Sequence, residues 1–349
     1  MPKYTVDVLI IGQGIAGSIL GYVLKKAGYS VCILDDNLRK SSTKVAAGLV
    51  SYISGKRLTL SWRAHDLIPS ALRFYKALEA DLGTTFYHPL SSLRIFTTED
   101  ERRIFEKKRH LPEFQDFYGD VYESGEPFMI KAPFGAAELR GSCFLDTSHF
   151  LSAMSDYFGS DIHHMRVNWD DIQVTEYGVR YHDYASKKVI CCSGYNVTET
   201  PWFSSLPYRP ARGQTLTMEV PKIDTDKIYN FGRWMVPLKS GLFKFGATYE
   251  WDDMSPIISK EAKEELLEHF NRHFDASPSV REQEVGIRCM VRDLCPIIGF
   301  LKNSPSIGIF SGFGSKGVMM VPYFAEQLAQ HISTSSPIDE DVSLERFEL

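Results

Sequence analysis

The sequence predicts an α/β fold in which a parallel sheet flanked by helices carries a second, smaller α+β domain as an insertion. The chain begins with an apolar strand, a glycine-rich turn, a helix and a second strand. A second glycine-rich turn precedes a helical segment near the other end, and aromatic residues and strand-like runs are concentrated in 86–135 and 200–285. We therefore expect a Rossmann-like domain built from both ends of the chain, with a mixed β-sheet domain inserted into it.

The first βαβ unit has the pattern of a dinucleotide site. An apolar strand over 6–11 leads into a G-x-G-x-x-G turn over 12–17, followed by a helical run and a second strand over 31–34 that ends at Asp35. Such a turn presents the free N–H groups of a helix start to a pyrophosphate. The acid at the end of the second strand accepts the ribose hydroxyls and disfavours a ribose that carries a 2′-phosphate. Strand, helix and acid together argue against a glycine-rich turn without a ligand.

Each glycine of this turn has its own physical role. Gly12 makes the tight turn, Gly14 lets the backbone approach the pyrophosphate, and Gly17 lets the helix pack on the strand.

Composition limits the class of protein. The chain has 349 residues, of which 44% are hydrophobic and 24% charged, as in an ordinary globular protein with room for two domains. A net charge of −5 argues against nucleic acid as the main partner. No apolar run reaches the length of about 18 residues that a membrane span needs, and the first apolar run belongs to the fold instead of a signal peptide. The six cysteines lack CxxC spacing, which favours free thiols and a cytoplasmic location.

The middle of the chain alternates between helical and strand-like patterns. Helices are expected over 60–82, 99–109, 148–158 and 258–274, and strands over 162–167, 178–184, 188–193, 214–220 and 243–249. Asp146 should cap the third of these helices. Cys191 and Cys192 are adjacent in a strand, so their side chains should face opposite sides of the sheet. The adjacent pair His163 and His164 would diverge on a strand for the same reason, and no metal site is expected.

The second glycine cluster, Gly312 to Gly317, also matches G-x-G-x-x-G and opens a helical segment. It cannot start a second complete mononucleotide fold, because no further strand and acid follow. A glycine turn that opens a helix still presents N–H groups to an anion or a polarised carbonyl. The alternative is a packing loop after the last strand of the sheet.

In this order, the motifs resemble the D-amino-acid oxidase family of FAD-dependent oxidoreductases, which includes glycine oxidase and sarcosine oxidase. The resemblance covers most of the chain. Besides the two glycine clusters and Asp35, it rests on Ala46-Ala47-Gly48, Val167, Cys192-Ser193-Gly194, Arg212-Gly213-Gln214, Phe245-Gly246-Ala247-Thr248 and Gly286-Ile287-Arg288. It implies FAD as the cofactor, with the first turn on the pyrophosphate and the second at the far end of the flavin.

The resemblance also implies which residues contact the cofactor. They are Gly12, Gly14, Ile15, Ala16, Gly17, Asp35, Asp36, Lys44, Ala46, Ala47, Gly48, Val167, Ser193, Gly194, Gly312, Gly314, Ser315, Lys316, Gly317 and Val318. The implied FAD domain comprises 1–85, 140–200 and 285–349, and the implied substrate domain comprises 86–139 and 201–284.

Arg288 stands where glycine oxidase-like members carry the arginine that pairs with the substrate carboxylate. A planar guanidinium holds a carboxylate with two parallel hydrogen bonds and so fixes the carbon that bears the amine. A structural salt bridge is the alternative role for this residue. Arg57, Arg63 and Arg292 compete with it, and Arg57 lies roughly where sarcosine oxidase-like members carry basic site residues.

Six more residues are site candidates, some of them through the same resemblance. Lys244 approximately matches a lysine that assists oxygen reduction in sarcosine oxidases, and Lys316 is a second candidate for a cation beside the flavin. Tyr249 is a candidate for substrate binding, as are Trp234 and Tyr323 for shaping the pocket. Cys289 resembles the cysteine that is bonded to flavin in sarcosine oxidases, although a buried free thiol is the simpler expectation.

The expected activity is oxidation of the C–N bond of an amino acid or an N-substituted glycine by hydride transfer to flavin N5, with oxygen as the acceptor. Three alternatives stay open. One is an FAD oxidase that modifies the wobble uridine of tRNA, the second is an amino-acid dehydrogenase that uses a different acceptor, and the third is a non-catalytic flavin-binding module. The expected partners are a small amino acid or amine and oxygen, without nucleic acid or a membrane span.

Overall fold

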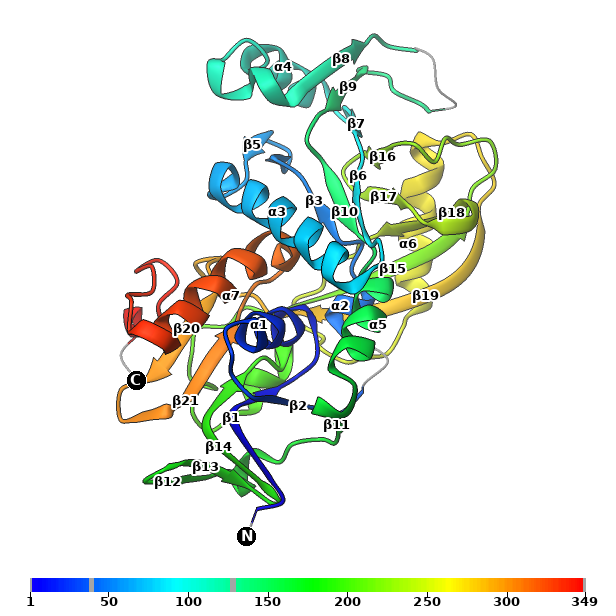
Figure 1. The fold of residues 1–349 in the computed structure, drawn as a ribbon. Helices are drawn as coiled ribbons and strands as arrows, with labels where there is room; N and C mark the ends of the chain where they lie inside the picture. Colours follow the sequence, from blue (N-terminus) through cyan, green and yellow to red (C-terminus); the bar gives the residue numbers. More distant parts are fainter. Residues whose placement is uncertain (1, 38–40, 126–129, 348–349) are drawn as a thin grey trace.

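The computed structural model describes residues 2–37, 41–125 and 130–347 of the chain, and these form two lobes (Figure 1). The lower lobe in this view contains the first sheet, with α1 and α7 on one face of it. The upper lobe contains α6 and the second sheet, whose strands β9 and β8 lie at the top beside α4.

The first sheet is the expected parallel one. Its strands follow the order β11-β2-β1-β14, and the second edge of β14 is shared by β21, which is parallel, and β13, which is antiparallel. Strand β20 pairs with β21, and β12 with β13. The bounds are β1 Tyr4–Ile11, β2 Val31–Asp35, β11 Ile162–His164, β12 Gln173–Thr175, β13 Gly178–Tyr181, β14 Tyr184–Cys191, β20 Ile297–Leu301 and β21 Ser304–Ser311.

Strand alternation builds a hydrophobic core on each face of this sheet. Val8 and Ile10 pack with the helices α1, α3, α5 and α7, whereas Leu9 and Ile11 pack with the other core. Cys191 and Cys192 belong to opposite cores, as expected. The helices are α1 Ile15–Lys26, α3 Ala64–Leu82, α5 Thr147–Phe158 and α7 Gly317–Thr334.

The second sheet has the order β19-β15-β18-β17-β16-β7-β9-β8. Its strands are β7 Ser92–Ile95, β8 Tyr118–Tyr122, β9 Ala136–Leu139, β15 Ala211–Glu219, β16 Ile228–Asn230, β17 Trp234–Pro237, β18 Leu242–Gly246 and β19 Ser279–Arg288. Helix α6 (Lys260–His273) covers one face through Leu266 and Phe270. The short helix α2 (Ser42–Val45) contacts β19.

Small elements complete the fold. They are α4 Glu99–Lys108, the sheet formed by β3 Leu49–Val50, β10 Cys143–Leu145 and β6 Tyr87–Pro89, and the hairpin of β4 Ile53–Ser54 with β5 Thr59–Leu60. Within the described residues, none of the helices combines the length and apolar character of a membrane span.

Most expected elements are present, with shifted boundaries. The helices expected over 60–82, 99–109 and 258–274 are α3, α4 and α6, and the Asp146 carboxylate accepts a hydrogen bond from the His149 N–H at the start of α5. The strand expected over 178–184 was wrong in extent, because it breaks into a hairpin at His182, whose φ is +48°. The strand expected over 243–249 ends at Gly246. Strand β19 crosses the domain boundary expected at 285 and belongs to the second sheet throughout.

Candidate active site

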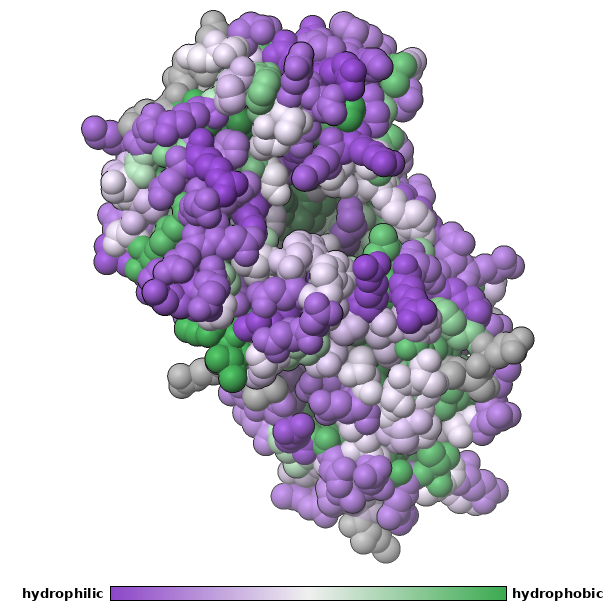
Figure 2. Space-filling model, turned by 180° about the vertical axis from the view of Figure 1, so that it is seen from behind, coloured by the Kyte–Doolittle hydropathy of each residue, from purple (hydrophilic) through white to green (hydrophobic). Residues whose placement is uncertain are grey.

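A cavity of about 1900 Å³ lies at the carboxyl ends of β1, β2, β14 and β21 and continues under the second sheet. Ligands of open α/β sheets bind at this edge. The volume exceeds the roughly 300–1,000 Å³ of a small-ligand pocket, so a dinucleotide and a second ligand have room together. The surface is hollowed between the two lobes, and apolar residues are visible inside the hollow (Figure 2).

The first turn has no space for side chains. Gly12 has φ +106°, and a Cβ on it would lie 2.6 Å from the carbonyl oxygen of Cys192. A Cβ on Gly17 would lie 1.8 Å from the carbonyl oxygen of Gly12. The turn therefore needs glycine at both positions to bring α1 against β1 and leave the helix start facing the cavity.

Asp35 is held at the end of β2 by the backbone around it. Its Oδ2 accepts a hydrogen bond from the Gln13 N–H at 2.7 Å, and its Oδ1 accepts one from the Asn37 N–H at 2.7 Å. A carboxylate oxygen has two lone pairs, so both oxygens can accept further hydrogen bonds from a ligand. Asp35 lines the same end of the cavity as Val167.

Sequence reasoning missed Thr43 at this end of the cavity. Its Oγ1 accepts a hydrogen bond from the Ile15 N–H at 3.1 Å, which ties α2 to the first turn of α1. A threonine in a polar loop gives no signal of such a contact, because its partner lies 28 residues away in the sequence.

The second glycine turn lies beside the end of β19. The Gly314 N–H donates to the carbonyl oxygen of Cys289 at 2.9 Å, and Met290 forms a bridge with Phe313. Helix α7 then begins at Gly317, facing the cavity. The Nζ of Lys316 donates to the Ser61 Oγ at 2.8 Å, and burial lowers the pKa of this lysine. This turn therefore lies next to Arg288.

Arg288 ends β19 on the face that looks into the cavity. Alternation along β19 places Gly286 against α2 on the same side, whereas Gln283 points to α6. The Arg288 Cζ lies 4.3 Å from the centroid of the Tyr249 ring, and burial lowers the pKa of its guanidinium. On its other side the guanidinium touches Gly213, where an added Cβ would lie 2.3 Å from Nη1.

One nitrogen of the Arg288 guanidinium lacks a hydrogen-bond acceptor. Its Nη1 is buried without a hydrogen-bond partner, and among the described residues no carboxylate forms an ion pair with it. A buried donor without an acceptor costs about 1–3 kcal/mol, more for a charged group. A ligand with a carboxylate would remove that penalty.

The competing arginines are used elsewhere. Arg57 is exposed and does not line the cavity, and its carbonyl oxygen accepts a hydrogen bond from the Lys108 Nζ at 2.9 Å. Arg63 pairs with Asp339 at 2.6 Å and donates to the Tyr323 hydroxyl at 3.0 Å. Arg292 is exposed. Arg288 is therefore the candidate that the fold brings to the cavity.

Lys244 is not among the residues that line the cavity. Its Nζ forms an ion pair with the Glu284 Oε2 at 3.0 Å and donates to the carbonyl oxygen of Lys44 at 3.2 Å. Sequence reasoning missed Glu284 as the partner of Lys244, because Glu284 lies on β19 and Lys244 on β18, with β15 between the two strands. The lysine neutralises this carboxylate and ties α2 to the second sheet.

Cys289 lines the cavity and is buried. Burial raises the pKa of its thiol to about 11. At neutral pH the group is therefore a neutral thiol and a weak nucleophile. Within the described ranges, no cluster of His, Cys, Asp or Glu is arranged to hold a metal ion.

The structure brings most sequence-predicted site residues to one cavity. Those that line it are Gly12, Gly14, Ile15, Ala16, Asp35, Asp36, Lys44, Ala46, Ala47, Gly48, Val167, Ser193, Gly194, Tyr249, Arg288, Gly312, Gly314, Ser315, Lys316, Gly317 and Val318. Trp234 lines it too, whereas Gly17, Arg57, Lys244 and Tyr323 do not.

This site fits FAD. The turn at Gly12 and Gly14 leaves backbone, not side chains, where a pyrophosphate would approach α1. The Ser193 Oγ is buried without a partner and lines the cavity, so it has a free donor and acceptor for a ligand. The second glycine turn offers a further helix start, that of α7 at Gly317, beside Ile15 at the start of α1.

Comparison with known proteins agrees with the site. Residues 7–331 match the model of the FAD dependent oxidoreductase family, DAO. Glycine oxidase from Geobacillus kaustophilus shares the fold with a TM-score of 0.85 and 17% identity, covering 99% of this chain and 100% of that one. Iminodiacetate oxidase from Chelativorans sp. has a TM-score of 0.77 and 19% identity, covering 98% of each chain.

One curated relative is named for tRNA modification and not for amino-acid oxidation. The tRNA 5-methylaminomethyl-2-thiouridine biosynthesis bifunctional protein MnmC of Marinobacter nauticus is 23% identical over 94% of this chain, which covers 56% of that protein. The chain thus spans about half the length of the curated relatives it matches. The family match, by contrast, extends over most of the chain and agrees with the cavity, the two glycine turns and the acid of β2. The protein is an oxidoreductase that belongs to the DAO family of FAD-dependent enzymes.

Proposed function

We propose that this enzyme oxidises the C–N bond of an amino acid or an N-substituted glycine, with oxygen as the electron acceptor. The observation that carries the proposal is Arg288. It is a buried guanidinium with an unpartnered Nη1 and no carboxylate of its own among the described residues. A cation in this state binds a ligand carboxylate strongly. The names of two proteins with this fold, glycine oxidase and iminodiacetate oxidase, also support a substrate of this class.

The residues of the site have separate roles in this proposal. Arg288 binds the carboxylate through its planar fork and thereby orients the neighbouring α-carbon. Tyr249 lies against the guanidinium and restricts its movement. The first glycine turn and Asp35 hold the dinucleotide, and the start of α7, which lies beside the start of α1, contributes a second positive dipole end to the cavity. When bound, FAD accepts the hydride equivalent that the α-carbon loses.

No acid or base of the protein is needed if the amine binds unprotonated. The nitrogen lone pair then assists loss of hydride from the α-carbon, and water hydrolyses the resulting imine. On the face of β19 that carries Arg288, Glu284 lines the cavity and is neutralised by Lys244.

A second candidate is oxidation of a modified wobble uridine in tRNA. The observation that favours it is the match to MnmC proteins over 94% of this chain. A carboxymethylaminomethyl group is itself an N-substituted glycine, so Arg288 would bind its carboxylate in the same way. The two candidates differ in the nitrogen substituent, and the net charge of −5 favours a small molecule over tRNA.

An anaerobic substrate panel tests the proposal. The holoenzyme is mixed with glycine, sarcosine, iminodiacetate, proline and D-amino acids, and bleaching of the flavin absorbance is followed, with Arg288→Met as the matched variant. We expect bleaching by at least one compound, peroxide formation when air is admitted, and loss of both in the variant. Bleaching without peroxide would indicate another acceptor. Failure of the whole panel, together with turnover of carboxymethylaminomethyl-uridine in tRNA by mass analysis, would support the second candidate.

A further inference from the structure

The segment 249–258, here called the strap, follows β18 and borders the cavity. Its side chains Tyr249, Met254 and Pro256 line the cavity. Its first residues pair with β15: the Arg212 N–H donates to the carbonyl oxygen of Glu250 at 2.9 Å, and the Glu250 N–H donates back to that of Arg212 at 3.0 Å.

Alternation sorts the side chains of this pairing onto two faces. Gly213 and Tyr249 lie on the cavity face, and the Arg288 guanidinium lies against both. Arg212 and Glu250 lie on the opposite face, toward α6. Gly213 and Tyr249, which contact the Arg288 guanidinium, are thus held by their sequence neighbours Arg212 and Glu250, which do not line the cavity.

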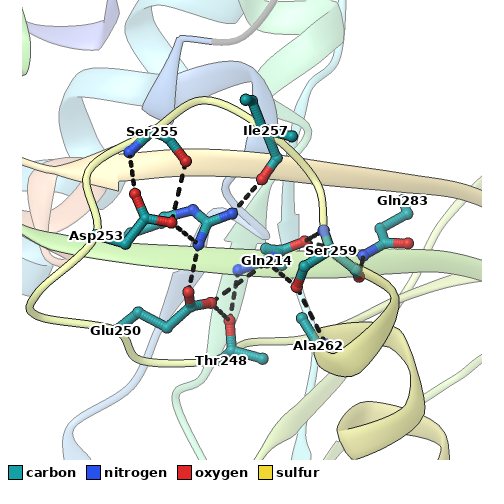
Figure 3. A network of polar contacts seen from close by, with 10 residues as sticks. Gln214, Thr248, Glu250, Asp253, Ser255, Ile257, Ser259, Ala262 and Gln283 are labelled. Carbon is teal, nitrogen blue, oxygen red and sulfur yellow. Dashed lines mark hydrogen bonds and ion pairs between the residues drawn. The ribbon is translucent and has the colours of Figure 1, made fainter.

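Arg212 is the hub of this network. Figure 3 shows Glu250, Asp253 and Ile257 turned toward one guanidinium. The Arg212 Nη1 forms ion pairs with Glu250 and, at 2.8 Å, with Asp253, and its Nη2 donates to the carbonyl oxygen of Ile257. The Arg212 side chain is only 4% exposed, whereas Asp253 is 54% exposed. A single buried cation therefore holds the beginning, the middle and the end of the strap.

Gln214 fixes the far end of the strap from the same face of β15. Its Oε1 accepts from the Ser259 N–H at 2.9 Å, and its Nε2 donates to the Ser259 Oγ at 3.1 Å. That hydroxyl also accepts from the Ala262 N–H and caps α6 (Figure 3). Gln214 thereby anchors the end of the strap to α6, and Arg212 binds the strap before that point, at Glu250, Asp253 and Ile257.

We infer that Arg212 is a positioning residue of the substrate site: it holds the strap so that the Tyr249 ring lies on the Arg288 guanidinium. This inference rests on the proposed carboxylate-binding role of Arg288. Without the Arg212 cation, Glu250 and Asp253 would repel each other. Glu250 would keep its hydrogen bonds from Gln214 and Thr248, whereas Asp253 and the carbonyl of Ile257 would lose their contact with β15, so the strap would loosen. Tyr249 would then no longer restrict Arg288, and carboxylate binding would weaken although Arg212 never touches the ligand.

The test compares Arg212→Gln, Arg212→Lys and Arg281→Gln holoenzymes. Arg281, on the neighbouring strand β19, pairs with Glu219 on the surface and is a matched control. Glycolate, a carboxylate of the size of glycine, is titrated against the flavin absorbance. We expect about 30-fold weaker binding for Arg212→Gln and about fivefold for Arg212→Lys, which keeps the charge but loses the fork. Arg281→Gln should bind as the wild type does.

A second readout follows the strap without any ligand. Tyr249 and Trp251 are both partly exposed and are chymotrypsin sites. Cleavage of Arg212→Gln there should be about tenfold faster than cleavage of the wild type or Arg281→Gln. An unchanged cleavage rate, or unchanged glycolate affinity with faster cleavage, would overturn the inference.

A third variant separates this inference from the proposed function. If Arg288→Met binds glycolate as tightly as the wild type, the carboxylate site is not at Arg288 and the proposed function fails. The cleavage rate would still decide whether Arg212 holds the strap. If both Arg288→Met and Arg212→Gln bind weakly, the double variant should be no weaker than Arg288→Met alone, because Arg212 acts through Arg288. Additive losses would overturn that coupling.

Discussion

The two ends of the cavity are built in different ways. The nucleotide end is built around one continuous segment, β1, α1 and β2, whose backbone atoms and Asp35 face the cavity, with Thr43 and Val167 added from other segments. The other end is assembled from β15, the strap, β19 and the turn before α7, which are far apart in the sequence. There the work is done by side chains, above all Arg288.

This difference explains which changes each end tolerates. Close backbone packing fails when any atom is added, because neither partner can move away. A long side chain such as Arg288 can shift by some tenths of an ångström, so its binding strength changes by degrees. The nucleotide end should therefore respond to substitution in an all-or-none way, and the substrate end in a graded way.

The largest effect should come from Gly17→Ala. The new Cβ would lie 1.8 Å from the carbonyl oxygen of Gly12, so α1 must move away from β1. We expect at least roughly 100-fold weaker FAD binding, seen as loss of the flavin absorbance from purified protein. Gly21→Ala, on the same helix but outside the cavity, is the control and should retain FAD, because its Cβ would meet only the ends of side chains, the nearest being the Phe158 ring at 2.9 Å. Equal FAD content in both variants would contradict the all-or-none response expected at the nucleotide end.

Gly213→Ala should have the next largest effect and should be graded. The Cβ would lie 2.3 Å from the Arg288 Nη1 and 2.7 Å from the carbonyl oxygen of Thr248. The guanidinium can move only partly aside because Tyr249 covers its other face, and the backbone at Thr248, just before the strap, must shift as well. We expect glycolate binding to weaken about 20-fold with unchanged FAD content. A variant that lost FAD as well would show that the two ends are not independent.

Lys244→Met should act on stability and not on chemistry. It removes the partner of Glu284, whose side chain is 21% exposed, and we expect the free energy of unfolding to fall by about 1–2 kcal/mol. The added substitution Glu284→Gln should restore part of the loss. Thermal unfolding of the holoenzymes measures this. If reoxidation of the reduced flavin by oxygen slowed instead, Lys244 would have the oxygen-activating role that its sequence context suggests.

The smallest effect concerns Cys289. Burial raises the pKa of its thiol to about 11, so at pH 8 only about one thiol in a thousand is ionised. Iodoacetamide should modify Cys295, which is partly exposed, much faster than Cys289. Acid precipitation should release the FAD from the protein. Yellow colour that stayed with the precipitate would show a bond between Cys289 and the flavin.

The sequence predicts the nucleotide end well, because its signals are local. Gly12, Gly17 and Asp35 occur at fixed spacings, and the contacts they make follow from the βαβ geometry. At the substrate end, sequence reasoning found Arg288 through a motif but missed Gly213 as its neighbour and Glu284 as the partner of Lys244. Both contacts depend on strand register in a sheet of distant segments, which no single stretch of sequence specifies.

The central claim is that Arg288 binds the substrate carboxylate. Titration of glycolate against the flavin absorbance of wild-type, Arg288→Met and Arg57→Met holoenzymes tests it most directly, because Arg57 is the exposed competitor. We predict at least roughly 100-fold weaker binding for Arg288→Met and unchanged binding for Arg57→Met, with full FAD content in both. Wild-type affinity in Arg288→Met, or a comparable loss in Arg57→Met, would contradict the account.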